Sequence, residues 1–153
     1  MKSVVYLDAM CFCYAFEGDD SVATAPRRLL ALLETRPRSI ATSELALAEI
    51  MAGVEKRRAL ALKRLYLNLF RRDGPLFVTP VTRRILLESA RIRAAHKGKL
   101  NLADAIHLVA AIEAGCAYFV TNDQRITSPQ GGPVILRPND DGVAVATEAI
   151  CAG

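Results

Sequence analysis

The sequence predicts a three-layer α/β/α fold around a central, mostly parallel sheet of four to five strands. Short apolar runs of strand length alternate with longer segments of helical character, which is the pattern of parallel strands connected by helices. The chain has 153 residues and is 52% hydrophobic, enough to bury one substantial core. We therefore expect a single domain over residues 1–153.

The amino-terminal half supplies the first two strands and three helical segments. "SVVYLD" (3–8) is an apolar run that ends in an acid, as expected of a buried strand. A helix is predicted over residues 21–35, before Pro37, and "RSIAT" forms a short second strand. Thr42 or Ser43 can cap the helix "SELALAEIMAGVEKRR", and "ALALKRLYLNLFRRD" continues as a second helix or a bent extension.

The second half repeats the alternation. "LFVT" is the third predicted strand, and Thr79-Pro80 opens a helix to about Lys97 because proline is favoured in a first helical turn. Asn101 can cap the helix in "LADAIHLVAAIEAG", which ends at Gly115. "AYFVTND" and "PVILR" are the fourth and fifth predicted strands, and the tail shows only a turn-like "NDDG".

Composition excludes several classes of protein. No uncharged apolar run approaches the roughly 18 residues of a membrane span, and Asp8 interrupts what would be a signal segment, so we expect a cytoplasmic protein without a membrane segment. The first two cysteines are spaced C-x-C, which is not a zinc spacing, and there are only two histidines. Small buried thiols in a reducing compartment explain all four cysteines: Cys11, Cys13, Cys116 and Cys151.

Positive charge is concentrated in one part of the chain. The net charge is +4, but residues 56–99 hold thirteen lysines and arginines and only two acids, a net charge of +11. The remainder of the chain is therefore at −7. Such asymmetry is typical of a surface that binds a polyanion, although ordinary solvated helix faces also carry charge runs.

Two acids end predicted strands. Asp8 follows "VVYL" and Asp123 follows "YFVTN". Sites in parallel sheets form at the carboxyl ends of the strands, so we expect both carboxylates at one edge. Either residue alone could equally begin a turn.

A third acid lies inside the apolar run "LNLADAIHLV". Asn101 and Asp104 resemble a capping box, and an acid in the first turn suits the helix dipole. His107 lies three residues further and shares a face with Asp104. That face would present a carboxylate and an imidazole together, although an ordinary helix histidine satisfied by a neighbour explains His107 as well.

Two glutamates compete in "SELALAEIMAG". Glu44 and Glu49 are five residues apart, about 140° around a helix, so they cannot share a face. Glu44 lies in the first turn, where any acid is favourable. Capping does not explain Glu49 in mid-helix, so Glu49 is the better candidate for chemistry.

The order "YLDAM", "LALAEIMAG" and "NLADAIHLVAAIEAGCAYFVTND" resembles the PIN domain family, in particular the VapC-type toxins of toxin–antitoxin pairs. The most specific part is the Asp-Ala-x-His helix followed by a strand that ends in Thr-Asn-Asp. Residue by residue, the matches to the family's acidic quartet are Asp8, Glu49, Asp104 and Asp123. Glu44 falls outside the matched position.

The resemblance implies an endoribonuclease that depends on Mg²⁺ or Mn²⁺. Four converging carboxylates repel one another, and a divalent cation with hard oxygen ligands relieves the repulsion. Asp8 and Asp104 would be the primary ligands and Asp123 would complete the cluster. Glu49 would act through a water, through a second metal, or as a base on the attacking water.

One departure concerns the corner after the first strand. The family often has Thr, Ser or a nearby Asn after its first Asp, whereas Ala9 follows Asp8 here. The polar support that is missing from this corner would have to come from the other strand. Thr121 and Asn122 are placed to supply it, and His107 is a further supporting candidate.

The resemblance also implies partners. RNA phosphates would bind the cations of residues 56–99, with Arg125 close to the scissile position. A VapB-like antitoxin would cover the active site, and the apolar "ALALKRLYLNLF" could face that partner, a second copy in a homodimer, or the core. Two alternatives remain: a housekeeping RNA-processing nuclease, and a non-catalytic RNA-binding or protein-binding domain.

Overall fold

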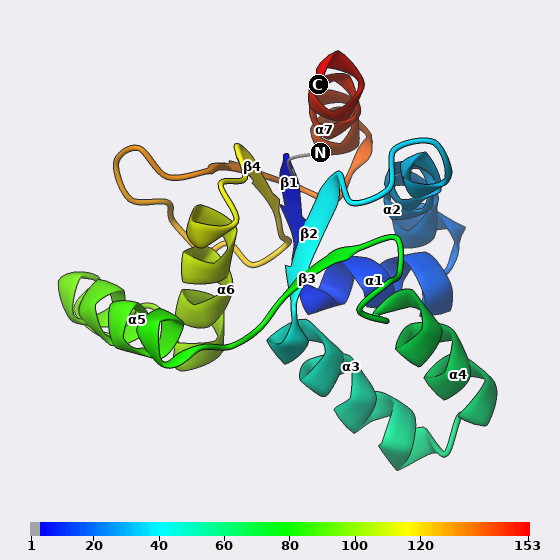
Figure 1. Cartoon of the computed structure of the whole chain (residues 1–153), viewed down its shortest axis with the longest axis horizontal. Coiled ribbons are helices and arrows are strands. Elements are labelled where there is room, and N and C mark those ends of the chain that lie inside the picture. Colours follow the sequence, from blue (N-terminus) through cyan, green and yellow to red (C-terminus); the bar gives the residue numbers. More distant parts are fainter. Residues whose placement is uncertain (1–3) are drawn as a thin grey trace.

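The sheet at the centre of the molecule has five strands, all of them parallel. The computed structural model describes residues 4–153 and orders the strands β3-β2-β1-β4-β5 (Figure 1). The predicted α/β class and parallel sheet are confirmed. The strands are short, with bounds β1 Val5–Leu7, β2 Ile40–Ser43, β3 Phe77–Thr79, β4 Tyr118–Val120 and β5 Val134–Leu136.

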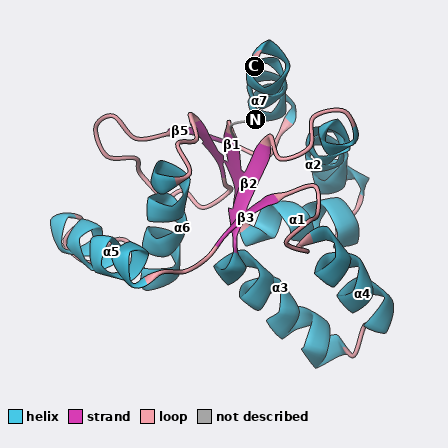
Figure 2. Cartoon of the chain, viewed as in Figure 1, coloured by secondary structure: helices cyan, strands magenta, loops and turns pink. Residues whose placement is uncertain are grey.

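Helices cover both faces of this sheet, which makes three layers (Figure 2). One face packs against the group α1, α2, α3, α4 and α7, and the other packs against α5 and α6. A short 3₁₀ turn, Leu32–Glu34, follows α2. The helix bounds are α1 Ala9–Glu17, α2 Asp20–Ala31, α3 Glu44–Arg57, α4 Leu60–Leu69, α5 Arg83–Ala95, α6 Leu102–Glu113 and α7 Asp140–Ala152.

Alternation along the strands divides the core in two. Val5 and Leu7 of β1 face the cluster under α1–α4 and α7, whereas Tyr6 faces the cluster under α5 and α6. Phe119 of β4 joins Tyr6, with ring centroids 5.0 Å apart in an edge-to-face arrangement. The central strands β1 and β2 are buried on both faces, whereas the outer strands β3 and β5 are partly exposed. Burial on both faces explains why β1 is a continuous apolar run rather than a polar–apolar alternation.

Several predicted boundaries were correct. Ser43, one of the two predicted caps, accepts the Leu45 N–H at 3.1 Å and starts α3. Asn101 accepts the Asp104 N–H at 2.8 Å and starts α6, and Gly115 ends that segment with φ of 70°. The segment "ALALKRLYLNLF" forms a separate helix, α4, which buries Tyr66.

Other predictions of local structure were wrong. The helix expected to open at Thr79-Pro80 begins at Arg83, because the Thr82 side chain caps it by accepting the Ile85 N–H. Two helices were not predicted. Asp8 is the cap of α1 as well as the end of a strand run, and "NDDG" is the start of α7 rather than a turn.

The carboxyl ends of the strands form the edge that carries the site. Figure 1 shows α3 and α4 on one side of this edge and α5 on the other, so the basic stretch of residues 56–99 flanks the edge from both directions. Some of its cations are paired within the chain, such as Lys63 with Glu55 and Arg84 with Glu113. Within residues 4–153, no helix is both long and apolar enough to cross a bilayer.

The start of α7 depends on the absence of a side chain at Gly142. A Cβ built there would lie 1.9 Å from the Arg137 carbonyl oxygen, a backbone atom that cannot move aside cheaply. We expect Gly142→Ala to lower the free energy of unfolding by about 2 kcal/mol or more through overpacking. Gly53→Ala is the matched control, because its Cβ meets nothing nearer than the Arg57 side chain at 3.9 Å.

Urea denaturation of both variants measures this difference. Gly53→Ala should raise stability by up to about 1 kcal/mol, since alanine is the better residue inside a helix. Equal stability of the two variants would show that α7 begins differently from the structure described here.

Candidate active site

A cavity of about 400 Å³ opens at the carboxyl ends of β1 and β4. This is the topological switch point of the sheet: the chain adds β2 and β3 on one side of β1, and then β4 and β5 on the other side. Crevices of this kind are the usual ligand sites of parallel sheets. We call it the acidic cavity, and its lining residues are Asp8, Ala9, Met10, Tyr14, Glu49, Asn101, Ala103, Asp104, His107, Asn122, Asp123 and Arg125.

Asp8 is fixed by the two elements that it joins. Its Oδ1 accepts the Cys11 N–H at 3.3 Å as the cap of α1, and its Oδ2 accepts a hydrogen bond from the Thr121 hydroxyl. Burial raises the pKa of this carboxyl, while the Thr121 and Cys11 contacts act in the opposite direction. Thr121 thus gives Asp8 the polar contact that Ala9 cannot.

Asp123 is held from the same strand end. Its backbone N–H donates to Thr121 Oγ1 at 3.1 Å, so a single hydroxyl connects the Asp8 and Asp123 segments. The Arg125 guanidinium binds its carboxylate through Nε at 3.1 Å and Nη2 at 2.8 Å. These contacts lower the pKa of Asp123.

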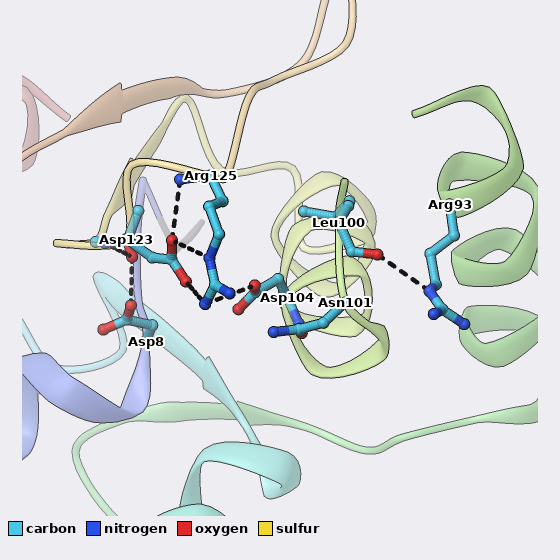
Figure 3. A network of polar contacts seen from close by, with 8 residues as sticks. Asp8, Arg93, Leu100, Asn101, Asp104, Asp123 and Arg125 are labelled. Atoms are coloured by element: carbon cyan, nitrogen blue, oxygen red, sulfur yellow. Dashed lines mark hydrogen bonds and ion pairs between the residues drawn. The ribbon is translucent and has the colours of Figure 1, made fainter. Parts of the chain in front are cut away.

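Asp104 projects from the first turn of α6 toward the same place. Figure 3 shows the Arg125 guanidinium between Asp123 and Asp104, with Nη2 lying 4.0 Å from Asp104 Oδ2. Burial, followed by repulsion from Asp123, raises the pKa of Asp104 to about 6. In the described part of the chain, Asp104 Oδ2 is the one buried side-chain nitrogen or oxygen without a hydrogen-bond partner.

Glu49 reaches the cavity from α3 and is bound by a histidine of α6. His107 Nε2 lies 2.5 Å from Glu49 Oε1, and His107 Nδ1 lies 2.7 Å from the Tyr6 hydroxyl. A neutral imidazole has one N–H, and an ionised Glu49 can only accept, so that proton belongs on Nε2. Tyr6 therefore donates to Nδ1, consistent with burial raising the pKa of its phenol.

The structure thus brings all four acids of the predicted quartet to one cavity and leaves Glu44 outside it. Thr121 and His107 contact acids of the quartet directly, at Asp8 and Glu49. Asn122 does not contact these carboxylates. Its Nδ2 instead donates to the Tyr14 hydroxyl at 3.2 Å.

Two contacts of the site were not foreseen in the sequence. Tyr6 was expected only as a core residue of the first strand, yet it orients His107. Its position between Val5 and Leu7 put its side chain on the α6 side of the sheet, which was the available signal. Arg125 was expected to meet phosphate, whereas its guanidinium is paired with Asp123.

The donor set fits a hard divalent cation. It consists of carboxylate oxygens with no thiolate. The buried Asp104 Oδ2 has no hydrogen-bond partner among the described residues; it is repelled by Asp123 and lies 4.0 Å from Arg125 Nη2. Across residues 4–153, no three acidic, histidine or cysteine side chains already lie at the spacing of a complete ion site. In the structure as described, the positive charge between Asp104 and Asp123 is the guanidinium of Arg125.

The fold and the cavity place the protein in the class of three-layer α/β proteins that have a four-acid cavity at the switch point of a parallel sheet. The PIN domain family matches residues 5–130, and the chain belongs to that family. A search of curated proteins finds no match.

Solved structures with the same fold include toxin–antitoxin proteins. A toxin–antitoxin complex from Klebsiella pneumoniae aligns with a TM-score of 0.64 at 21% identity, covering 90% of this chain and 98% of the other. DNA-bound VapBC from Salmonella typhimurium aligns at 0.64 and 18% identity, covering 90% and 99%. VapC20 of Mycobacterium tuberculosis, a toxin that cleaves the sarcin–ricin loop, aligns at 0.62 and 18% identity, covering 78% and 90%. At these identities the similarity establishes the fold.

The raised pKa of Asp104 predicts that this residue destabilises the metal-free protein. The folded chain holds the Asp104 proton up to about pH 6, whereas the unfolded chain releases it near the ordinary value of 3.8. Ionised Asp104 therefore costs stability above pH 6, and the cost disappears below 3.8. We expect Asp104→Asn to stabilise the protein at neutral pH by about 1 kcal/mol, after allowing for solvent that reaches the cavity.

Thermal unfolding in a chelator at several pH values measures the effect. The gain should be roughly 3 °C at neutral pH and should vanish in acid. Asp123→Asn is the contrasting variant, because Arg125 lowers the pKa of Asp123 and ionised Asp123 is favourable in the folded state. A stabilisation of the same size from Asp123→Asn would contradict this account of the cavity.

Proposed function

We propose that the protein is an endoribonuclease that hydrolyses RNA phosphodiester bonds with Mg²⁺ or Mn²⁺, as the cytoplasmic toxin of a VapBC-type pair. The observation that carries the proposal is the convergence of Asp8, Glu49, Asp104 and Asp123 on one cavity. Membership of the PIN domain family supports nuclease chemistry, and the toxin–antitoxin proteins of the same fold support the toxin role.

The acids divide into ligands and a base. Asp8 and Asp104 are the proposed primary ligands, and Asp123 completes the cluster. A bound divalent cation would lower the pKa of a water and neutralise charge that develops on the phosphate. Asp104 must lose its proton to bind such an ion, so its carboxylate becomes available as the pH rises through about 6.

Glu49 is the proposed base on the attacking water. One of its oxygens accepts from His107, while the carboxylate remains partly exposed to the cavity. His107 itself is almost fully buried and is held by Tyr6. This chain of contacts fixes the direction in which Glu49 can take up a proton.

Arg125 is the proposed phosphate contact at the mouth of the cavity. Its side chain is 66% exposed and is held by two carboxylates of the quartet. When those carboxylates bind a cation, their pull on Arg125 weakens, and the guanidinium can meet an RNA phosphate instead. The basic stretch of residues 56–99, which flanks the edge on both sides, extends this positive surface.

A protein antitoxin and a second copy of the chain are the proposed partners. An apolar cavity of about 350 Å³, to which α1, α2 and α4 contribute, suits a partner segment. Leu65 and Leu67 add exposed apolar surface on α4. On α5, Leu86 and Leu87 are exposed and are the candidates for a homodimer contact.

Conversion of each acid to its amide tests the proposed function. Asp8→Asn, Glu49→Gln, Asp104→Asn and Asp123→Asn should each lower Mn²⁺-dependent cleavage of structured RNA by more than about 100-fold, since loss of supporting groups alone costs 10–100-fold. Glu44→Gln, on the same helix as Glu49 but outside the cavity, should cleave like the parent. Full activity of Asp8→Asn or Asp104→Asn would show that the site is wrongly assigned.

The His107 contact predicts a graded effect. His107→Ala removes the donor to Glu49 and should lower the cleavage rate by about tenfold or more. His107→Gln can place an amide N–H near the position of Nε2 and should recover part of the rate.

A purely structural role for His107 predicts otherwise. Both variants would then lose stability and activity in parallel, and His107→Gln would recover none of the rate.

A further inference from the structure

A second cavity lies directly beside the acidic cavity. It has a volume of about 400 Å³, and the residues that matter for its chemistry are Tyr14, Val22, Asn122, Gln124, Arg137 and Asn139. Tyr14 and Asn122 line both cavities, and their side chains are hydrogen-bonded to each other. The Tyr14–Asn122 pair is therefore the ridge between them, and a ligand in the second cavity lies next to the proposed reaction centre. We call this second space the amide cavity.

One short segment of chain serves both cavities. After β4, Thr121, Asp123 and Arg125 direct their side chains to the acidic network, as the contacts in Figure 3 show for the labelled pair. Gln124 lines only the amide cavity, whereas Asn122, on the ridge, lines both cavities. Adjacent residues therefore carry the acids and the amides, so the separation between the two cavities is fixed by the backbone.

The charge around the amide cavity does not suit a phosphate. Arg137 is the one cation among its described lining residues, and its Nη1 already donates to the Thr121 carbonyl at 3.0 Å. Ser21 and Asn139 line the cavity at the starts of α2 and α7. Acids adjoin both of them in the sequence, namely Asp19, Asp20, Asp140 and Asp141. These carboxylates do not line the cavity, so what disfavours a bound anion is that the cavity's one described cation, Arg137, is already engaged by a carbonyl.

Three exposed amides of the amide cavity have polar side-chain atoms that lack a partner in the described part of the protein, and amides can pair with a nucleobase. Within residues 4–153, no hydrogen bond engages the Gln124 amide, the Asn122 carbonyl oxygen or the Asn139 side-chain N–H₂, while Asn139 Oδ1 accepts from Gly142. Amides present a donor and an acceptor side by side, which matches the edge of a base. Single-stranded RNA is recognised in this way, through exposed base edges.

We propose that the amide cavity binds the base of the nucleotide adjacent to the scissile phosphate, and that Gln124 and Asn122 select that base. The proposal rests on the proposed ribonuclease function and adds the part of the substrate that determines where it is cut. Asn122 is held by Tyr14, whose hydroxyl accepts a hydrogen bond from its N–H₂ and leaves its carbonyl oxygen without a partner among the described residues.

Sequencing of the cleavage products of a random-sequence RNA pool tests the proposal. The parent protein should show a base preference at one nucleotide beside the cut. Gln124→Ala and Asn122→Ala should each reduce that preference by about tenfold, the scale of one well-made side-chain–base contact. Gln130→Ala is the matched control, because Gln130 lies in the same connection between β4 and β5 but outside both cavities, and its preference should equal that of the parent.

A binding measurement separates this proposal from the ribonuclease function. Saturation-transfer NMR with the four free ribonucleosides should detect binding that Gln124→Ala removes and that Asp104→Asn retains. If the RNA pool is not cleaved, the ribonuclease function fails and the nucleoside measurement still decides the cavity. Nucleoside binding that is lost in Asp104→Asn but kept in Gln124→Ala would overturn the proposal. The proposal would also be overturned if no nucleoside binds and if Gln124→Ala and Asn122→Ala both cut RNA with the base preference of the parent.

Discussion

The site depends on the side-by-side ending of β1 and β4. Leu7 pairs with Val120 in the parallel ladder, and the Asp8 N–H continues the ladder by donating to the Val120 carbonyl at 3.4 Å. Asp8 and Thr121 are therefore neighbours by register, before any side chain is considered. The Thr121 hydroxyl then joins the Asp8 carboxylate to the Asp123 backbone. A slip of this register by one residue would separate the acids and turn the side chains of the shifted strand to the opposite face of the sheet.

Because of that register the carboxylates lie close together, and the effect of this crowding on the pKa differs from one acid to the next. The Arg125 guanidinium lowers the pKa of Asp123. Burial and repulsion from Asp123 raise the pKa of Asp104. Glu49 stands apart from this conflict because His107 binds it from the other helix of the edge. Opposite pKa shifts on two acids that line one cavity are an arrangement that functional sites often show.

The sequence determined the sheet and the four acids more reliably than the ends of the helices. Parallel strands are apolar runs, and their carboxyl ends must share an edge, so Asp8 and Asp123 could be placed without coordinates. Asp8 also caps α1, but the sequence of that helix, "AMCFCYAFE", is apolar up to its final Glu17 and has no helical alternation of polar and apolar residues. α7 was missed because "NDDG" has turn composition, and its glycine is required by the Arg137 carbonyl, a contact that no local pattern reveals.

Side-chain pairing across the fold was beyond sequence reasoning for a related reason. Glu49 and His107 are 58 positions apart, and their contact depends on how α3 and α6 meet at the edge of the sheet. The same limit applies to Arg125, whose neighbours in space are the acids that it was expected to assist. In contrast, the alternation of residues 121–125 between two cavities follows from local chain geometry. If the acids bind a metal and the amide cavity binds a base, one stretch of backbone sets both the position of the cleaved bond and the position of that base.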